Sequence, residues 1–290
     1  MSGSDHTSGQ RGIYVFSLLL TTIIWGTSFP AIKIVTSFID PVTYTWVRGL
    51  IALLGLTPVL IHSLVRGSLG RRAVLGGSLT GLIFAAGLWL QGWGTSLTTA
   101  SNAGFITGMN VVFVHLYDAL VVKDKMYGRR AFTSLFLSLI GLYLLTSPEG
   151  LPGIGDMLVF ISALLFAAQV ELIGRFAKEN PLLFTFFEML PFLIFIVRDL
   201  AVGIPSSGIV TALPWLIYLG LICSDIALAL QVFGQRRVRP YEAAILYLFE
   251  PVMAAIFSFV ILGEVLNPVQ YVGAALILGG MAVVTFKSDK

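Results

Sequence analysis

The sequence is short of charge. Only 11% of its residues are Asp, Glu, Lys or Arg, whereas soluble domains carry about a quarter charged residues. Hydrophobic residues occupy 57% of the 290 positions. This balance excludes a water-soluble globular domain and indicates a chain that is solvated by lipid.

Cysteine and histidine are also scarce. The single cysteine, Cys223, excludes an internal disulfide, and no cysteine and histidine positions have metal-ligand spacing. The motifs HExxH and GxSxG and paired metal-binding aspartates are missing, which argues against a membrane-embedded enzyme. We therefore expect a protein that is not an enzyme and that has no metal, no cofactor and no nucleic-acid partner. A channel is disfavoured because no ring of like polar residues is visible.

Long apolar runs recur along the whole chain, and each approaches the roughly 20 residues that a helix needs to cross a bilayer. They predict an all-α polytopic membrane protein with ten transmembrane helices. The predicted spans are Ile13–Ile34, Pro41–Leu64, Ala73–Gly94, Thr99–Val122, Ala131–Ser147, Gly155–Phe176, Pro181–Gly203, Leu213–Phe233, Pro240–Leu262 and Pro268–Phe286.

The basic residues predict how this bundle is oriented. Fifteen of the 18 lysines and arginines fall on one side of the predicted membrane, leaving Lys33, Arg48 and Arg198 as exceptions. Cytoplasmic loops collect positive charge, so we expect both termini to be cytoplasmic and the protein to be a multi-pass component of the cytoplasmic membrane.

The two halves of the chain match when one is shifted by 140 residues without a gap. Proline, threonine, leucine, glutamine, glycine and alanine positions coincide in the pairs Pro41/Pro181, Thr45/Thr185, Leu50/Leu190, Gln91/Gln231, Gly94/Gly234 and Ala103/Ala243. Five spans per half force the second half to enter the membrane from the opposite face. The expected organisation is a disordered tail (1–12), two inverted repeats (13–147 and 153–286) and a cytoplasmic tail (287–290), the architecture of many secondary transporters.

The same shift pairs the polar residues of the spans. It relates Asn110 to Glu250, Asn102 to Glu242, Arg48 to Glu188, and Gln91 to Gln231. By helical rise, Asn110 and Glu250 lie midway through their spans, and the other pairs divide between the two sides. An acid at such depth is costly and is a functional candidate by default.

Glu250 is followed by Pro251, which lacks an amide hydrogen and frees the Tyr247 carbonyl at the same depth. Glu250 is a candidate for binding a substrate ammonium or for carrying a coupling proton. The alternative is a neutral acid that hydrogen-bonds Asn110 or a freed carbonyl and stabilises a kink. Glu171 and Asp225 also lie inside spans but have no polar repeat mate, so they rank below Glu250.

Several segments resemble the drug/metabolite transporter superfamily, in particular its EamA-type ten-helix family. The segments are WGTSF (25–29), Arg48, TTASNAGFITGMNVVF (98–113), EPVMAAIFSFVILGE (250–264) and QYVGAALILGG (270–280). The resemblance implies two five-helix repeats around a central cavity and alternating access without ATP, and many relatives export amino acids or related metabolites. The first repeat departs from the family pattern at 123–125, where KDK replaces the GE of 263–264, so no acid is symmetric to Glu264.

Arginine and aromatic positions complete the expected cavity. Arg48 could bind a substrate carboxylate, form an ion pair with Glu188 that breaks in one conformational state, or extend to the nearer membrane surface. Trp25, Trp89 and Tyr247 could form an aromatic wall, although Trp and Tyr also gather at membrane interfaces. The expected substrate and cavity residues are Trp25, Arg48, Trp89, Gln91, Asn102, Asn110, Glu188, Gln231, Glu242, Tyr247 and Glu250.

The sequence therefore predicts a secondary transporter that exports amino acids or related amphipathic compounds. The expected partners are a small-molecule substrate, membrane lipid and, as a candidate coupling ion, the proton, and the expected state is a monomer or homodimer. A flippase for a lipid-linked carrier, which the same fold can serve, is the alternative function.

Overall fold

The chain is helical throughout the part that the structure describes. The computed structural model describes residues 5–98, 100–122, 128–146, 153–262 and 267–285, and no strand occurs among them. The first half contains α1 (Asp5–Gly26), α2 (Ser28–Thr36), α3 (Pro41–Val65), α4 (Arg71–Leu97), α5 (Ala100–Gly108), α6 (Asn110–Tyr117), the π-helical η1 (Asp118–Val122) and α7 (Arg129–Thr146).

The second half is also helical. It contains α8 (Ile154–Phe176), α9 (Pro181–Met189), the 3-10 segment η2 (Leu190–Phe195), α10 (Ile196–Val202), α11 (Ser206–Ile217), the π-helical η3 (Tyr218–Ile226), α12 (Ala227–Gly234), α13 (Pro240–Tyr247), α14 (Phe249–Leu262) and α15 (Pro268–Thr285).

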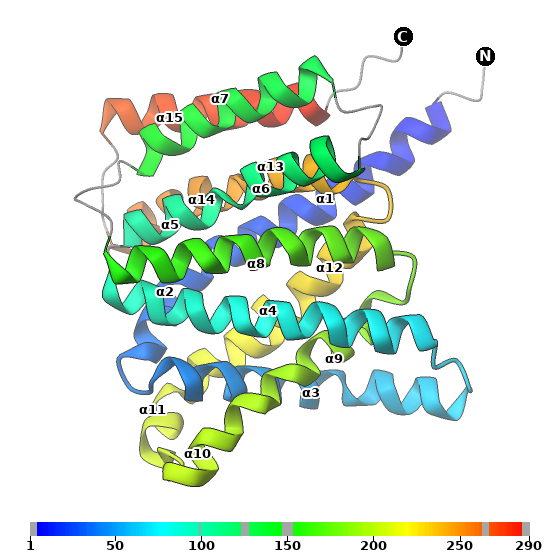
Figure 1. The fold of residues 1–290 in the computed structure, drawn as a ribbon, viewed down its shortest axis with the longest axis vertical. Coiled ribbons are helices and arrows are strands. Elements are labelled where there is room, and N and C mark those ends of the chain that lie inside the picture. The colour runs from blue at the N-terminus through cyan, green and yellow to red at the C-terminus, as the bar shows by residue number, and fades with distance from the viewer. Residues whose placement is uncertain (1–4, 99, 123–127, 147–152, 263–266, 286–290) are drawn as a thin grey trace.

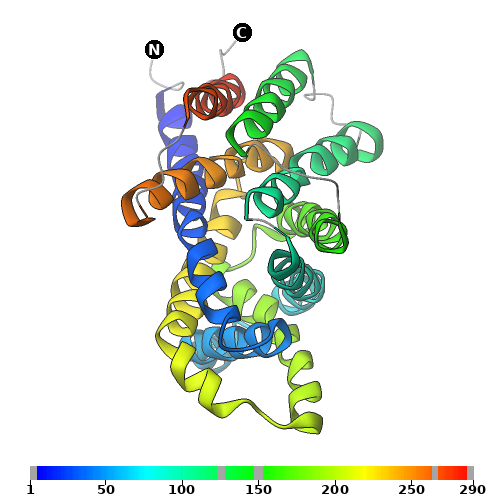
Figure 2. The same cartoon turned by 90° about the vertical axis from the view of Figure 1, so that its left-hand side faces the viewer.

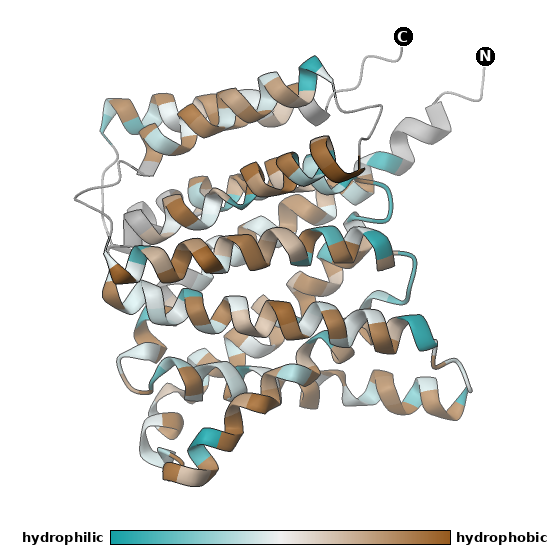
Figure 3. Cartoon of the chain, viewed as in Figure 1, coloured by the Kyte–Doolittle hydropathy of each residue, from teal (hydrophilic) through white to brown (hydrophobic). Residues whose placement is uncertain are grey.

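The helices lie roughly side by side and their ends form two opposite faces of the bundle (Figure 1). The starts of α1, α4, α9 and α13 gather at one of these faces (Figure 1). The loops before α4, α9 and α13 carry basic residues, among them Arg66, Lys178 and Arg237, and are called the basic loops below. Helices α7 and α15 pack together at one edge, and α10 and α11 lie at the opposite edge (Figures 1 and 2). Hydrophobic residues cover most of each helix, whereas hydrophilic residues concentrate at the loops (Figure 3).

Seven helical stretches of the described residues are long and apolar enough to cross a membrane. They are Arg11–Thr36, Pro41–Val65, Arg71–Leu97, Ala103–Val122, Ile154–Phe176, Pro181–Val202 and Ser206–Gly234. The prediction of an all-α polytopic membrane protein is confirmed. The other three predicted spans coincide with α7, α13 with α14, and α15, and their crossing of the membrane stays a prediction.

The N-terminal segment differs from expectation. Residues 1–12 were expected to form a disordered tail, but α1 begins at Asp5, eight residues before the predicted first span. Arg11 of this extension donates a 2.8 Å hydrogen bond to Glu242 at the start of α13. A tertiary ion pair of this kind cannot be read from local composition.

Three spans are interrupted near the middle of the bundle. Helices α1 and α2 meet at Thr27, α5 and α6 at Met109, and α13 and α14 at Leu248. The last break agrees with the expected effect of Pro251, which removes a backbone donor. A Cβ on Gly108 would lie 3.3 Å from Leu248, so two of the breaks face each other.

Two hydrophobic cores flank the interrupted helices. One is built around α3, α4, α9 and η2, and the other around α6, α7, α13 and α15. Trp25, at the end of α1, packs against both cores. The space between the cores is where a polar site can form without disrupting either one.

Close packing of α4 against α9 depends on glycine. A Cβ added to Gly81 would lie 2.1 Å from the backbone oxygen of Glu188. Because backbone cannot move aside cheaply, we expect Gly81→Val to destabilise the protein by about 3 kcal/mol or to prevent folding. Thermal unfolding in detergent checks this, with Gly279→Ala, which meets nothing within 4 Å, as the matched control. Equal melting temperatures for the two variants would contradict the prediction.

Candidate functional site

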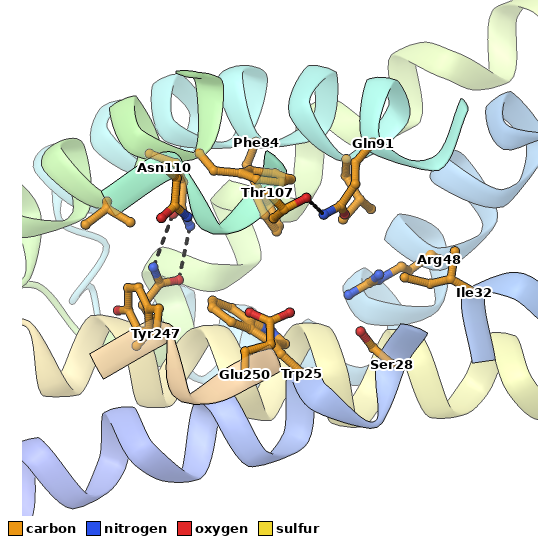
Figure 4. Close-up of a pocket in the computed structure, with 15 residues that line it drawn as sticks. Trp25, Ser28, Ile32, Arg48, Phe84, Gln91, Thr107, Asn110, Tyr247 and Glu250 are labelled. Carbon is orange, nitrogen blue, oxygen red and sulfur yellow. Dashed lines mark hydrogen bonds between the residues drawn. The ribbon is translucent and has the colours of Figure 1, made fainter. Parts of the chain in front are cut away.

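A cavity of about 70 Å3 lies between the two cores. Ten helices contribute to its wall, including both halves of each interrupted span (Figure 4). The lining residues are Trp25, Ser28, Ile32, Arg48, Phe84, Leu88, Gln91, Thr107, Asn110, Phe166, Gln169, Val170, Gln231, Tyr247 and Glu250.

Arg48 supplies a cation to this wall. Its side chain is only 3% exposed, with Nε donating to Ser224 Oγ at 2.8 Å and Nη1 donating to Tyr44 OH at 2.5 Å. No acid of the described residues forms an ion pair with Arg48, so the pair with Glu188 is not formed in this structure. The buried Arg48 side chain does not extend to the outside of the bundle. A buried guanidinium with no directly bonded acid is costly unless an anion binds beside it.

Glu250 supplies an acid to the same cavity (Figure 4). It lies in the first turn of α14, directly after the break at Leu248. Its carboxyl group has no hydrogen-bond partner among the described residues. Beside it, the Trp25 and Tyr247 rings pack with centroids 5.6 Å apart, and the indole N–H donates to the Cys223 carbonyl at 3.1 Å.

Amide side chains form a second polar set. Gln169 and Gln231 donate to each other at 3.1 Å in both directions, and Gln169 Nε2 also donates to Glu188 Oε1 at 3.0 Å. Toward the other end of the cavity, Gln91 donates to Thr107 Oγ1 at 3.1 Å (Figure 4). The cavity therefore presents neutral donors and acceptors as well as one guanidinium and one carboxyl group.

Seven of the eleven expected residues line the cavity, and three others lie elsewhere. Trp89 packs against Trp93 and Phe195, because its position on α4 is about 200° around the helix from Gln91. Glu188 is fully buried behind Gln169 and does not reach the cavity.

The third of these residues, Glu242, lies at a helix end. It accepts from Arg11 at 2.8 Å and from the Arg239 backbone N–H at 3.1 Å, so it caps α13. The side chain of the remaining expected residue, Asn102, is outside the described part of the structure, as is Glu264.

The cavity also contains residues that the sequence did not single out. The sequence could have indicated Thr107 as a cavity residue, because the 140-residue shift pairs it with Tyr247. Gln169 is another intramembrane amide, next to the acid Glu171. The apolar members have no signal that distinguishes them from other membrane residues: Ile32, Phe84, Leu88, Phe166 and Val170. Glu171 and Asp225 are buried but do not line the cavity.

A charged cluster holds the outer ends of α3 and α10 together. Asp199 is 1% exposed and accepts from Thr43 Oγ1 at 2.5 Å, from Trp46 Nε1 at 2.8 Å and from Arg198 at 2.9 Å. Arg198 also donates to Asp40 at 2.6 Å. Partial burial alone would raise the pKa of Asp40, but Arg198 and two backbone N–H donors lower it overall. This cluster accounts for Arg198, an exception to the charge pattern.

Comparisons with known proteins identify the family of this chain. The model of the EamA-like transporter family matches residues 12–147 and 153–286. An uncharacterized transporter of Archaeoglobus fulgidus is 30% identical over 96% of this chain and 88% of its own length, and the uncharacterized transporter YetK of Bacillus subtilis is 26% identical over 97% and 89%. A riboflavin transporter, ImpX, of Fusobacterium nucleatum is 26% identical over 71% and 72%.

One solved crystal structure superimposes on this chain with a TM-score of 0.73 at 17% identity, covering 95% of this chain and 96% of the other. That likeness shows a shared fold. Because the family model matches nearly the whole chain, this protein belongs to the EamA-like transporter family.

Proposed function

We propose that this protein is a secondary transporter that moves amino acids or related amphipathic metabolites across the cytoplasmic membrane, with export as the direction of net flux. One observation carries the proposal. Arg48 and Glu250, a cation and an acid, border the same cavity, and neither is paired with an opposite charge among the described residues.

Such a cavity complements a zwitterion. A carboxylate can accept hydrogen bonds from Arg48, whose Nε and Nη1 are already held in place by Ser224 and Tyr44. An ammonium group can bind Glu250 and the faces of Trp25 and Tyr247. Phe84, Leu88 and Phe166 offer apolar contact for a side chain. The arrangement provides one complementary group for each part of an amino acid.

The packing supports two inverted repeats. A Cβ on Gly234 would meet Leu18 on α1, and a Cβ on its mate Gly94 would meet Val159 on α8, the mate of α1. Gly108 and Leu248, also related by the 140-residue shift, contact each other, as expected for residues near a pseudo-twofold axis.

Helix starts repeat as well. Asp40 and its mate Asn180 both cap a helix whose first residue is proline. The family model also matches once in each half. These correspondences support a mechanism of alternating access, in which helix bundles rock around the central cavity and open its two ends in turn. Energy would come from the solute gradient or from protons.

The orientation of the protein follows from the same proposal. The basic loops gather at the face where α1 begins (Figure 1), so we place that face in the cytoplasm. Both termini would then be cytoplasmic. A C-terminal reporter that fluoresces only in the cytoplasm would test this placement.

Uptake into proteoliposomes tests the function. The purified protein is assayed with labelled amino acids, with riboflavin because of the riboflavin transporter among the relatives, and with a lipid-linked carrier. We expect saturable amino acid uptake that is accelerated by counterflow from preloaded vesicles. Acceleration by a pH gradient would identify the proton as the coupling ion. Transport of the lipid-linked carrier alone would contradict the proposal and favour a flippase.

A further inference from the structure

A pair of amide side chains bridges two helices at one end of the cavity. Gln169 of α8 and Gln231 of α12 donate to each other at 3.1 Å in both directions. Both side chains line the cavity, yet they are only 2% and 0% exposed. Because the pair is neutral and reciprocal, it can open without leaving a buried unpaired charge.

Two further layers of contacts follow toward the face that carries the basic loops. One turn beyond Gln231, Gln235 donates to the Val170 carbonyl at 2.8 Å and accepts from Tyr247 OH at 3.4 Å. Arg236 then donates to two backbone carbonyls after the end of α8. The C-terminal end of α12 is thereby joined to α8 at three successive depths.

The opposite end of the cavity has a different arrangement. Gln91 is the repeat mate of Gln231, but its amide donates to Thr107 of α5. In the described residues, Gln91 makes no hydrogen bond to α1 or α2, the segment related to α8 by the shift. Among the described residues, the amide bridge therefore joins the helices only at the end with the basic loops.

Glu188 determines how the amide pair is oriented. It is fully buried in α9, outside the cavity, and its Oε1 accepts from Gln169 Nε2 at 3.0 Å. Since this nitrogen must face the carboxyl group, the amide oxygen of Gln169 is left facing Gln231. The other oxygen, Oε2, is buried without a partner among the described residues, which is unfavourable for stability. Because Glu188 lowers the stability of the fold in this way, its position is better explained by its effect on the orientation of Gln169.

We propose that Gln169 and Gln231 form the cytoplasmic gate of the transport cycle, and that Glu188 is the positioning residue that keeps this gate closed. The inference rests on the proposed function, because a gate presupposes a transport cavity. It adds which end of the cavity is held shut and which residues must separate before the cavity opens inward.

Accessibility of a single thiol tests the gate without any substrate. Cys223→Ala removes the one native cysteine, and Ser28→Cys places a reporter in the cavity. A membrane-impermeant maleimide is applied to one face at a time, using right-side-out and inside-out vesicles. With the gate intact, we expect labelling from the cytoplasmic face to be at least about tenfold slower than from the other face.

Opening the gate should remove that difference. Gln169→Leu and Gln231→Leu each remove the two amide–amide hydrogen bonds, so we expect cytoplasmic labelling to accelerate roughly tenfold. Gln169→Leu also removes the hydrogen bond to Glu188. Gln270→Leu is the matched control, because Gln270 also bonds across helices, to the Leu145 carbonyl at 3.1 Å, but lies away from the cavity. Its labelling should equal that of the parent.

The role of Glu188 is tested by the rate of cytoplasmic labelling, which would not change if Glu188 only filled space. We expect Glu188→Leu to accelerate cytoplasmic labelling as Gln169→Leu does, with no further increase when the two are combined, since Glu188 acts through Gln169. Glu188→Gln, which keeps an acceptor oxygen, should restore slow labelling. If Glu188→Leu does not fold, Glu188→Asp, which withdraws the oxygen by one methylene, takes its place.

Two results would overturn the inference. One is equal labelling of the parent from both faces, which would show that this end is not closed. The other is a Glu188 variant that melts at a lower temperature but labels like the parent, which would make Glu188 a structural residue only. Either result leaves the proteoliposome test of transport unaffected, so failure of the gate and failure of the proposed function are distinguishable.

Discussion

Replacing Arg48 by methionine is expected to reduce amino acid uptake by at least about a hundredfold, because a buried charge that pairs with a ligand is worth several kcal/mol of binding. Methionine keeps most of the volume but removes every donor. The loss should be specific to the carboxylate, so uptake of an amine that lacks a carboxylate should change much less. Uptake of labelled amino acids and of the matching amines into proteoliposomes measures both effects.

Two further variants, one at Arg48 and one at Lys33, serve as controls for Arg48→Met. Arg48→Lys should recover little uptake, because an ammonium cannot bond Ser224, Tyr44 and a carboxylate with the geometry of the guanidinium. Lys33→Met removes an exposed cation of α2 that does not line the cavity, and it should leave uptake unchanged. An Arg48→Met variant that folds and transports amino acids normally would remove the carboxylate site from the proposal.

Replacing Glu250 by glutamine is expected to weaken amino acid uptake by roughly a hundredfold while leaving uptake of carboxylates that lack an ammonium group nearly unchanged. The substitution preserves shape and removes the charge that would attract the ammonium. Concentration dependence of uptake, with and without a pH gradient, measures the change in affinity separately from coupling.

Glu171→Gln is the matched control for Glu250, since Glu171 is a buried intramembrane acid outside the cavity. We expect it to leave substrate selectivity unchanged. If Glu250→Gln loses only the acceleration by a pH gradient and keeps exchange, the carboxyl group carries a coupling proton instead of binding the ammonium. Unaltered selectivity and coupling would make Glu250 a structural residue.

Four residues, two assigned to the cavity in error and two missed, show where sequence reasoning ends. Depth along a span is predicted from helical rise, and the structure places Asn110 and Glu250 beside helix breaks and in the cavity wall. Rotation about the helix axis does not follow, because helices in lipid are apolar on most sides and lack a clear amphipathic face. Trp89 and Glu188 were therefore assigned to the cavity, whereas Gln169 and Thr107 were not.

The predictions for Glu242 and for the N-terminal segment differ from the structure for a related reason. A carboxylate near a predicted helix start caps that helix readily, and only tertiary contact with α1 shows that Arg11 completes the interaction. The possible ion pair between Arg48 and Glu188 was inferred from repeat symmetry alone, and it is not formed in this structure. Symmetry relates equivalent positions in two environments, and it does not require the two residues to touch.

The sequence by itself determined the solvent, the helical class and the family. Scarce charge and long apolar runs leave a helical bundle in lipid as the folded state that satisfies the backbone. The tertiary structure alone decided which polar side chains share a cavity, that Arg48 is held by Ser224 and Tyr44 without an acid, and that Gln169 and Gln231 seal one end. The physical reason is that these outcomes depend on helix rotation and close packing. Both arise from contacts between residues far apart in the sequence, 176 positions for Arg48 and Ser224 and 62 positions for Gln169 and Gln231.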